Sequence, residues 1–191
     1  MFKVVQQAYI GLVFLMSASA LNGQSDVEAE IGYLGAFNGR DLTIWNTNVS
    51  HDFSSGAYFK LGYSYLIEKV HLQPAFSIGY HVFSVKGQAK EFSYQGVSHR
   101  FSMSAGVRYW LNDAWGTGVF IDAENNRDTE DWRTHTVDLL RYSVSFRGLW
   151  RIHSSLKLIA GYRTSLYPLQ EQYFLYNPPR QVFVGVNYGF L

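Results

Sequence analysis

The sequence predicts an all-β fold, an eight-stranded antiparallel up-and-down barrel that crosses a membrane. The last eleven residues alternate strictly, with an apolar or aromatic side chain at every second position and mostly small or polar ones between. The chain has 14 Tyr, 14 Phe and five Trp, yet only 16% of its residues are charged. Beyond the N-terminal segment, no apolar run approaches the ~20 residues of a membrane helix. A membrane protein without such helices must be a closed barrel, because every backbone polar group in hydrocarbon needs a partner.

The N-terminal segment predicts an export signal. Lys3 precedes an apolar run over residues 8–16, and Ser17-Ala18-Ser19-Ala20 then offers a small-x-small cleavage site. We expect residues 1–20 to be a signal peptide cleaved after Ala20, with Gly23 as the alternative site, and residues 21–191 to form the outer-membrane barrel domain. A transmembrane anchor is the other interpretation, but the run is much shorter than a bilayer-spanning helix.

Composition excludes several classes of function. Removing Lys3 from the 16 basic residues leaves 15, which equals the 15 acidic residues. A neutral chain lacks the basic surface that nucleic acid would require, so no nucleic-acid partner is expected. The absence of cysteine rules out disulfides and thiolate metal sites. We expect no cofactor and no metal.

The first four segments that alternate with a period of two are residues 27–37, 57–66, 70–85 and 99–111. We expect their outward faces to carry Val27, Ala29, Ile31, Tyr33 and Phe37; Ala57, Phe59, Leu61, Tyr63 and Tyr65; Val70, Leu72, Pro74, Phe76, Ile78, Tyr80 and Val82; and Phe101, Met103, Ala105, Val107, Tyr109 and Leu111. Each segment is long enough for the ~9–11 residues that a tilted strand needs to cross a bilayer.

The remaining four segments are residues 115–125, 137–150, 155–166 and 181–191. Their expected outward faces carry Thr117, Val119, Ile121 and Ala123; Leu140, Tyr142, Val144, Phe146 and Trp150; Leu156, Leu158, Ala160, Tyr162 and Leu166; and Val182, Val184, Val186, Tyr188 and Phe190. A barrel built from eight such strands returns both chain ends to the same side of the membrane.

The connections between segments alternate between short and long. Residues 67–69, 112–114 and 151–154 form short turns, whereas residues 38–56, 86–98, 126–136 and 167–180 form longer polar stretches. Outer-membrane barrels have short periplasmic turns and long external loops. Asn38-Gly39 offers an alternative, because a turn there would make residues 42–53 an extra strand. That would give nine segments, so a ten-stranded barrel would need one more strand, and we keep eight.

Aromatic residues gather where the strands should meet the two membrane interfaces. The lower set is Tyr65, Tyr109, Trp110, Trp115, Trp150, Tyr188 and Phe190, and the upper set includes Phe37, Phe59, Tyr80, Phe101, Tyr142 and Tyr162. A soluble ligand-carrying barrel of the lipocalin type is the alternative. It would place its large apolar side chains inside, whereas here the other face is rich in Gly, Ser and charges.

The inward face is predicted to hold a network of charges. By parity it contains Glu28, Glu30, Lys60, Arg100, Arg108, Asp122, Glu124, Arg141, Arg147, Lys157 and Arg163. An eight-stranded barrel is only wide enough for its own side chains, so these charges must pair. We expect a salt-bridge plug. The alternative is a narrow path that prefers anions, because bases outnumber acids seven to four among these residues.

With these features the mature chain resembles the small OmpA/OmpX-like outer-membrane β-barrels. The closing run, with Val182, Val184, Val186, Tyr188 and Phe190 on one face, is similar to the C-terminal signal that the barrel-assembly machinery recognises in such proteins. Leu191 departs from that pattern, because the aromatic normally ends the chain. The resemblance implies assembly-machinery contacts during biogenesis, outer-membrane lipid around the barrel and an envelope protein as a partner. It implies no peptidoglycan-binding domain.

No catalytic set is evident in the sequence. His99 and Ser102 fall on opposite faces of one segment, and His81 and His135 have no evident serine partner. We therefore expect no enzyme. The predicted role is structural, scaffolding or adhesive, exerted through external loops or envelope partners. A narrow pore for small solutes or ions is the alternative, and a lipid-modifying outer-membrane enzyme ranks third.

Overall fold

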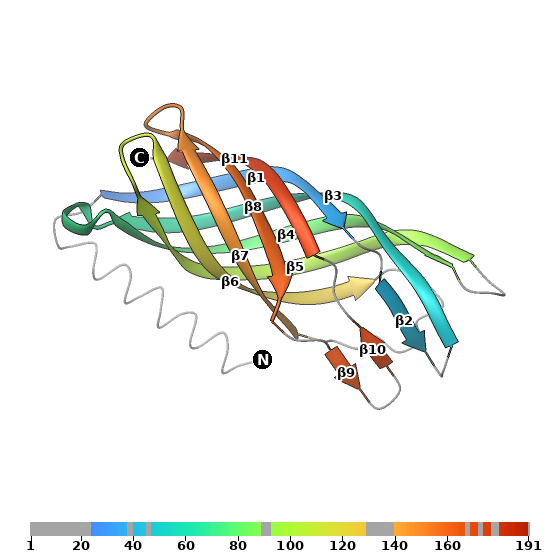
Figure 1. The fold of residues 1–191 in the computed structure, drawn as a ribbon. Coiled ribbons are helices and arrows are strands. Elements are labelled where there is room, and N and C mark those ends of the chain that lie inside the picture. Colours follow the sequence, from blue (N-terminus) through green and yellow to red (C-terminus); the bar gives the residue numbers. More distant parts are fainter. Residues whose placement is uncertain are drawn as a thin grey trace.

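The computed structural model describes residues 24–37, 40–44, 47–88, 93–128, 140–166, 169–171, 174–176 and 180–190. The described chain is a closed eight-stranded antiparallel barrel (Figure 1). Its wall consists of β1 (Gln24–Phe37), β3 (Thr47–Leu66), β4 (Leu72–Gln88), β5 (Ser93–Trp110), β6 (Trp115–Asp128), β7 (Leu140–Arg151), β8 (Leu156–Ser165) and β11 (Arg180–Phe190). Three short strands, β2 (Arg40–Ile44), β9 (Leu169–Glu171) and β10 (Phe174–Tyr176), lie outside this wall.

Closure comes from the pairing of the first strand with both of its neighbours. The wall runs in the order β1-β11-β8-β7-β6-β5-β4-β3, and β1 pairs antiparallel with β3 to complete the ring. Val27 lies opposite Phe190 of β11 on one side and opposite Tyr63 of β3 on the other. The up-and-down topology confirms the predicted fold class. Within the described residues no helix is long and apolar enough to cross a membrane.

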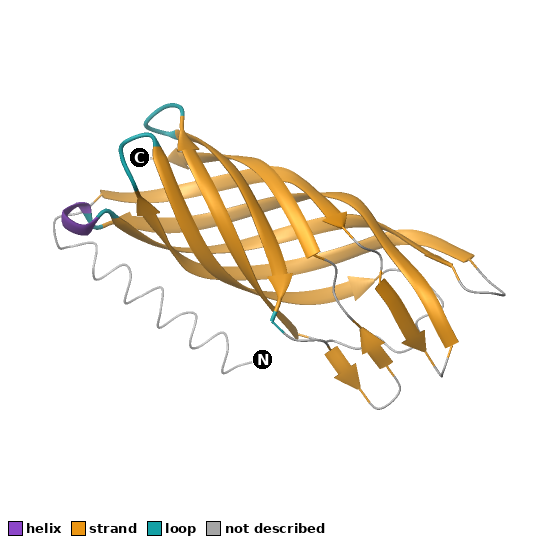
Figure 2. Cartoon of the chain, viewed as in Figure 1, coloured by secondary structure: helices purple, strands orange, loops and turns teal. Residues whose placement is uncertain are grey.

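The short turns and the two ends of the barrel domain share one rim. The turns after β3, β5 and β7, the start of β1 and the end of β11 all lie at the left of Figure 1, and Figure 2 shows these turns in teal and purple. The first turn contains a 3-10 helix at Glu68–Val70. Val70 was expected to begin the following strand, but it belongs to this turn. We call this rim the turn rim and the opposite rim the loop rim.

At the loop rim the strands extend further than predicted. β3, β4 and β5 contain 20, 17 and 18 residues, against ten in β8. Much of the expected loops at 38–56 and 86–98 is therefore strand, because β3 and β4 stay paired through Ser50 and Gln88 despite a register shift between Phe53 and Gly56. The extra strand considered at residues 42–53 divides between β2 and the start of β3. It adds a hairpin beyond the wall and leaves the number of barrel strands at eight.

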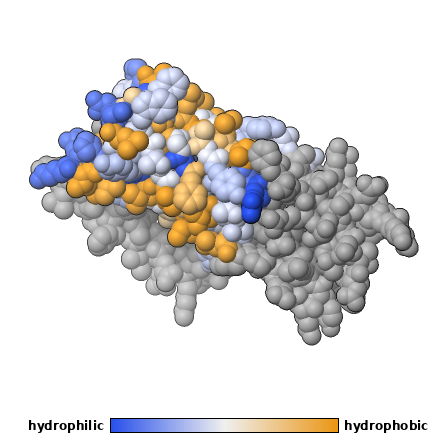
Figure 3. Space-filling model, in the orientation of Figure 1, coloured by the Kyte–Doolittle hydropathy of each residue, from blue (hydrophilic) through white to orange (hydrophobic). Residues whose placement is uncertain are grey.

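The outer face is apolar along every strand of the wall. Exposed large apolar residues include Ile31, Phe59, Ile78, Phe101, Val119, Ile121, Phe146 and Val184, each between 45% and 63% exposed. Orange atoms accordingly cover much of the described wall in Figure 3. Trp115 and Trp150 stack face to face near the turn rim, with ring centroids 5.4 Å apart. This distribution, with large apolar side chains outside and charged side chains inside, excludes the soluble ligand-carrying barrel and suits a lipid-facing surface.

Two residues expected in the lower aromatic girdle are buried. Trp110 is 3% exposed and points into the barrel, because its even position on β5 shares the face of Arg100 and Arg108. Tyr65 lies on the outward side of β3 but is only 6% exposed. The other described members of that set, Tyr109, Trp115, Trp150, Tyr188 and Phe190, are all exposed.

The interior also contains an apolar component that the sequence pattern did not suggest. Tyr58, Phe83, Phe120 and Phe183 are buried inside the wall. Each lies directly opposite an inward glycine on the neighbouring strand, in the pairs Gly32–Tyr58, Gly56–Phe83, Gly106–Phe120 and Gly161–Phe183. A ring that covers a cross-strand glycine fills space that no other side chain occupies. These pairs help to close the lumen around the charges.

Candidate functional site

The candidate site is the polar interior of the barrel. The structure places ten of the predicted inward charges there, each at most 4% exposed: Glu28, Glu30, Lys60, Arg100, Arg108, Asp122, Glu124, Arg147, Lys157 and Arg163. The eleventh, Arg141, is known only by its register position opposite Glu124, because its side chain lies outside the described part. Their common burial follows from strand parity, since alternate side chains of a strand face opposite sides of the wall.

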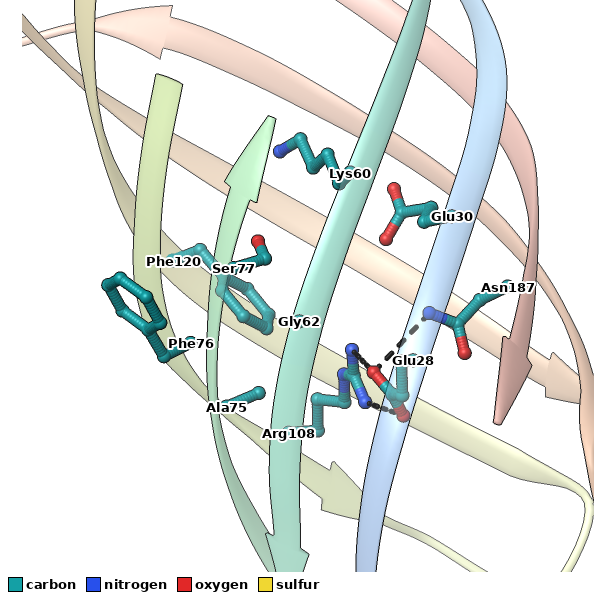
Figure 4. Close-up of a pocket in the computed structure, with 10 residues that line it drawn as sticks. All are labelled: Glu28, Glu30, Lys60, Gly62, Ala75, Phe76, Ser77, Arg108, Phe120 and Asn187. Atoms are coloured by element: carbon teal, nitrogen blue, oxygen red, sulfur yellow. Dashed lines mark hydrogen bonds and ion pairs between the residues drawn. The ribbon is translucent and has the colours of Figure 1, made fainter. Parts of the chain in front are cut away.

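Nearest the turn rim, Glu28 of β1 is the centre of a first cluster. Arg108 of β5 binds it through two nitrogen–oxygen contacts of 2.7 Å, and Lys157 of β8 adds a third contact of 2.7 Å. Asn187 of β11 donates to the same carboxylate at 3.3 Å (Figure 4). The paired geometry of the guanidinium and carboxylate is the strongest form of charged hydrogen bond. Glu28 thereby joins four strands across the lumen.

A hydrogen-bond chain leads from Glu28 towards the turn rim. Ser64 donates to Glu28 at 3.1 Å, and Gln73 donates to Ser64 at 2.9 Å. The indole of Trp110 then donates to Gln73 at 2.9 Å, and Arg151 lies over the Trp110 ring with its guanidinium carbon 4.0 Å from the centroid. Sequence reasoning missed Ser64 and Gln73, although both carry the inward parity of their strands.

The second cluster surrounds Asp122 of β6, which has no solvent exposure. Lys60 lies 3.4 Å from one of its carboxylate oxygens, Arg147 3.6 Å from the same oxygen and Arg163 3.5 Å from the other. Ser104 also donates to Asp122. Arg147 reaches on to Glu30 at 3.4 Å, so two acids and three bases form one connected group.

The third cluster lies nearest the loop rim and is centred on Glu124. Arg163 donates to it, Arg100 lies 3.6 Å away and Nδ1 of His81 lies 3.2 Å away. Because Arg163 contacts both Asp122 and Glu124, the second and third clusters are continuous. His81 is fully buried among these charges.

The structure also gives His81 a serine partner that the sequence did not reveal. Ser102 Oγ lies 3.1 Å from His81 Nε2, while the other ring nitrogen faces Glu124. Serine, histidine and carboxylate thus follow the order of the catalytic triad of serine hydrolases. All three side chains are at most 4% exposed, and two arginines form ion pairs with the carboxylate. No substrate carbonyl reaches such a serine without displacement of the network.

Aromatic rings fill the space beside the arginines. The Arg147 guanidinium carbon lies 3.8 Å from the Phe120 centroid, and that of Arg100 lies 4.7 Å from the Phe83 centroid. Stacking of this kind adds an attractive interaction and shields the ion pairs from water. A cavity of about 10 Å³ remains between the first two clusters, lined by Glu28, Glu30, Lys60, Arg108 and Asn187 among others (Figure 4). That is room for about one water molecule.

The charges of this interior are not balanced. Six buried bases face four buried acids within the described residues, and Asp26, with its side chain 16% exposed, lies 3.7 Å from Lys157. The surplus lies towards the loop rim, where Arg100 and Arg163 share Glu124. No group of three side chains able to hold a metal ion occurs in the part that the structure describes.

Comparison with known proteins identifies the fold. Ail, the attachment invasion locus protein of Yersinia pestis, aligns in two solved structures, one with the heparin analogue sucrose octasulfate and one in a phospholipid bilayer nanodisc. Identities are 12% and 14%, TM-scores are 0.50 for both, and the alignments cover 87% of this chain and 99% and 100% of Ail. The chain has the fold of the small OmpA/OmpX-like outer-membrane barrels.

Neisserial surface protein A also aligns with this barrel, at 14% identity and a TM-score of 0.47, over 87% of this chain and 97% of that protein. No protein-family model and no curated protein sequence matches the chain. The likeness therefore concerns the barrel architecture.

The residues of the proposed assembly signal all lie on the outer face of this barrel. Val182, Val184, Val186, Tyr188 and Phe190 all point outward from β11 and are between 37% and 55% exposed. The predicted signal peptide at residues 1–20 and Leu191 lie outside the described residues, so both remain predictions from sequence.

Proposed function

We propose that this protein is an integral outer-membrane barrel with a closed interior, and that its role is structural, scaffolding or adhesive. The packing of the lumen is the observation that supports this most. Three charge clusters and four aromatic–glycine pairs occupy it among the described residues, and the cavity between the first two clusters has room for about one water. A barrel filled in this way acts through its surfaces, namely the external loops and the lipid-facing wall.

The proposal includes a route to the membrane. The segment 1–20 directs export, and the outward face of β11 is the contact for the barrel-assembly machinery. Lipid of the outer membrane then surrounds the apolar wall, and an envelope protein binds the loop rim or the wall.

Affinity recovery of the tagged protein at native abundance tests the scaffolding role. The outer membrane is extracted in mild detergent, and co-purifying proteins are identified and quantified. We expect stoichiometric recovery with another envelope protein. Recovery of a heat-modifiable monomer alone would contradict the scaffolding role, and recovery in the soluble periplasmic fraction would contradict the membrane proposal altogether.

A narrow pore is the second candidate, favoured by one observation. The six buried bases exceed the four buried acids, which biases the lumen towards anions. The same residues are bound in ion pairs that span the lumen from β1 to β8, as between Glu28 and Lys157. Conduction would require these pairs to separate, so the closed barrel is the better supported function.

We also propose that the barrel is not an enzyme, although Ser102, His81 and Glu124 lie in contact. An active serine in this order reacts with a fluorophosphonate probe, whereas Ser102 is sealed behind its neighbours. We expect no labelling of the folded barrel in detergent or in lipid. Labelling that disappears in Ser102→Ala but persists in Ser64→Ala would contradict this expectation, because Ser64 is an equally buried serine without a histidine partner.

A further inference from the structure

The cavity between the first two clusters brings together buried polar atoms from three strands. Its lining includes Glu30 of β1, Arg108 of β5 and Asn187 of β11, each at most 4% exposed. Among the described residues, no hydrogen-bond partner reaches Oε1 of Glu30, Nε of Arg108 or Oδ1 of Asn187. Their other polar atoms are bound to Arg147 or to Glu28. Unpaired polar atoms inside a protein are costly, so three in one cavity indicate a shared partner.

The strand register explains why these groups meet in one place. Glu30 lies directly opposite Asn187 on β11 and directly opposite Lys60 on β3, so the three inward side chains form one row along the wall. Arg108 reaches the same cavity from β5, a strand that borders neither β1 nor β11 (Figure 4). Lys60 donates to two acceptors of the second cluster, which uses two of the three ammonium protons. One donor of Lys60 is therefore left for the cavity that it lines.

The lining also determines which kind of molecule fits. It offers two acceptors, on Glu30 and Asn187, and two donors, on Arg108 and Lys60. A partner must therefore donate twice and accept twice, as water does. The cavity volume of about 10 Å³ is that of about one water. A metal cation at this size would face two bases, and an anion would face the carboxylates of Glu28 and Glu30, so a neutral dipole is the better occupant.

We propose that this cavity binds one water molecule, which donates to Glu30 and Asn187 and accepts from Arg108 and Lys60. The water joins the first cluster, through Arg108 and Asn187, to the second cluster, through Glu30 and Lys60. One hydrogen-bonded network then crosses the lumen from Trp110 near the turn rim to the third cluster near the loop rim. This inference deepens the proposed closed interior and rests on it, because the water makes the two halves of the filled lumen continuous.

NMR spectroscopy of the nitrogen-15-labelled, folded barrel in detergent tests the proposal. Cross-relaxation is measured between water and the side-chain N–H protons of Arg108 and Asn187. A bound water gives NOESY peaks with the sign of the diagonal and ROESY peaks with the opposite sign, whereas proton exchange gives the sign of the diagonal in both. We expect the bound-water signature at both side chains. The buried amide of Gln73 is the control and should lack it, because this amide donates to Ser64, accepts from Trp110 and does not line the cavity.

Ala75→Val assigns the signal to this cavity, because Ala75 lines it and is only 6% exposed. The added methyl groups should displace the water and abolish the signature at Arg108, with folding verified by the heat-dependent gel shift. Ala105→Val is the matched control, since Ala105 is exposed on the outer face of β5 and its replacement should leave the signature unchanged.

Persistence of the signature in folded Ala75→Val would overturn the proposal, because the water would then lie elsewhere. Absence of the signature from Arg108 and Asn187 in the wild type, or an equal signature at Gln73, would overturn it without any variant. Either result would leave the closed interior standing. A steady current through the wild-type barrel would instead overturn the proposed function.

Discussion

Replacement of Glu28 by alanine is expected to lower the free energy of unfolding by about 3–5 kcal/mol. Glu28 is the shared partner of Arg108 and Lys157, each 2.7 Å away, and all three side chains are at most 4% exposed. Without the carboxylate, Arg108 loses the acid that it contacts and Lys157 keeps only the partly exposed Asp26 at 3.7 Å, in a lumen that already holds more buried bases than acids. A buried charge that loses its partner keeps its desolvation cost and loses the compensating attraction.

Urea titration of the refolded barrel in lipid vesicles, followed by the heat-dependent gel shift, measures this effect. Glu28→Gln separates charge from shape, since it keeps the volume and a hydrogen-bonding oxygen but removes the charge; we expect a loss of similar size. Glu68→Ala is the control, because Glu68 lies exposed in the turn after β3 and should change stability by less than about 0.5 kcal/mol. Equal stability of Glu28→Ala and the control would show that the cluster contributes nothing.

The second large effect is expected from Gly161→Val on β8. A Cβ atom at this position would lie within 3 Å of the Phe183 ring and of the Phe146 backbone oxygen, and the oxygen cannot move without the strand. Because Phe183 is itself buried against Gly161, the ring has no free space to enter. We expect Gly161→Val to prevent closure of the barrel, so that little or no heat-modifiable protein is recovered after refolding.

Gly148→Val on the neighbouring strand is the matched control. A Cβ atom at Gly148 would meet only one backbone oxygen, at 3.7 Å, and the residue faces outward next to Ala160. Valine also has a higher strand propensity than glycine, so this variant should fold at least as well as the wild type. Normal yields of folded Gly161→Val would contradict the interlocked packing of glycine and aromatic rings.

The architecture was readable from the sequence because one physical rule governs each strand. Lipid faces one side and the lumen the other, so a period of two runs along the whole wall and assigns each residue to a face. Glu28 and Lys157 were placed inside for that reason alone. Trp110 shows the limit of composition as a guide, since tryptophan near a turn suggested a membrane girdle. Its even position on β5 already gave the inward direction.

The partners within the lumen were not predictable. Arg108 and Glu28 lie 80 residues apart, and their contact depends on how far each strand is displaced along its neighbour. The same holds for Ser102 and His81, which became neighbours only through the β4–β5 register that pairs His81 with Arg100. Parity gives the face of a residue, whereas register and strand tilt decide its height. The sequence pattern therefore gives the face of each residue but contains little information on its height in the barrel.

Conductance of the reconstituted barrel tests the central claim, a closed interior, most directly. The purified wild type is inserted into a planar bilayer, with insertion verified by the heat-dependent gel shift of the same preparation. A lumen filled by the Glu28, Asp122 and Glu124 clusters predicts no steady current above the bare bilayer at low or high salt. A steady, anion-selective current of the wild type that disappears in Arg147→Ala would contradict the closed barrel and establish the narrow pore in its place.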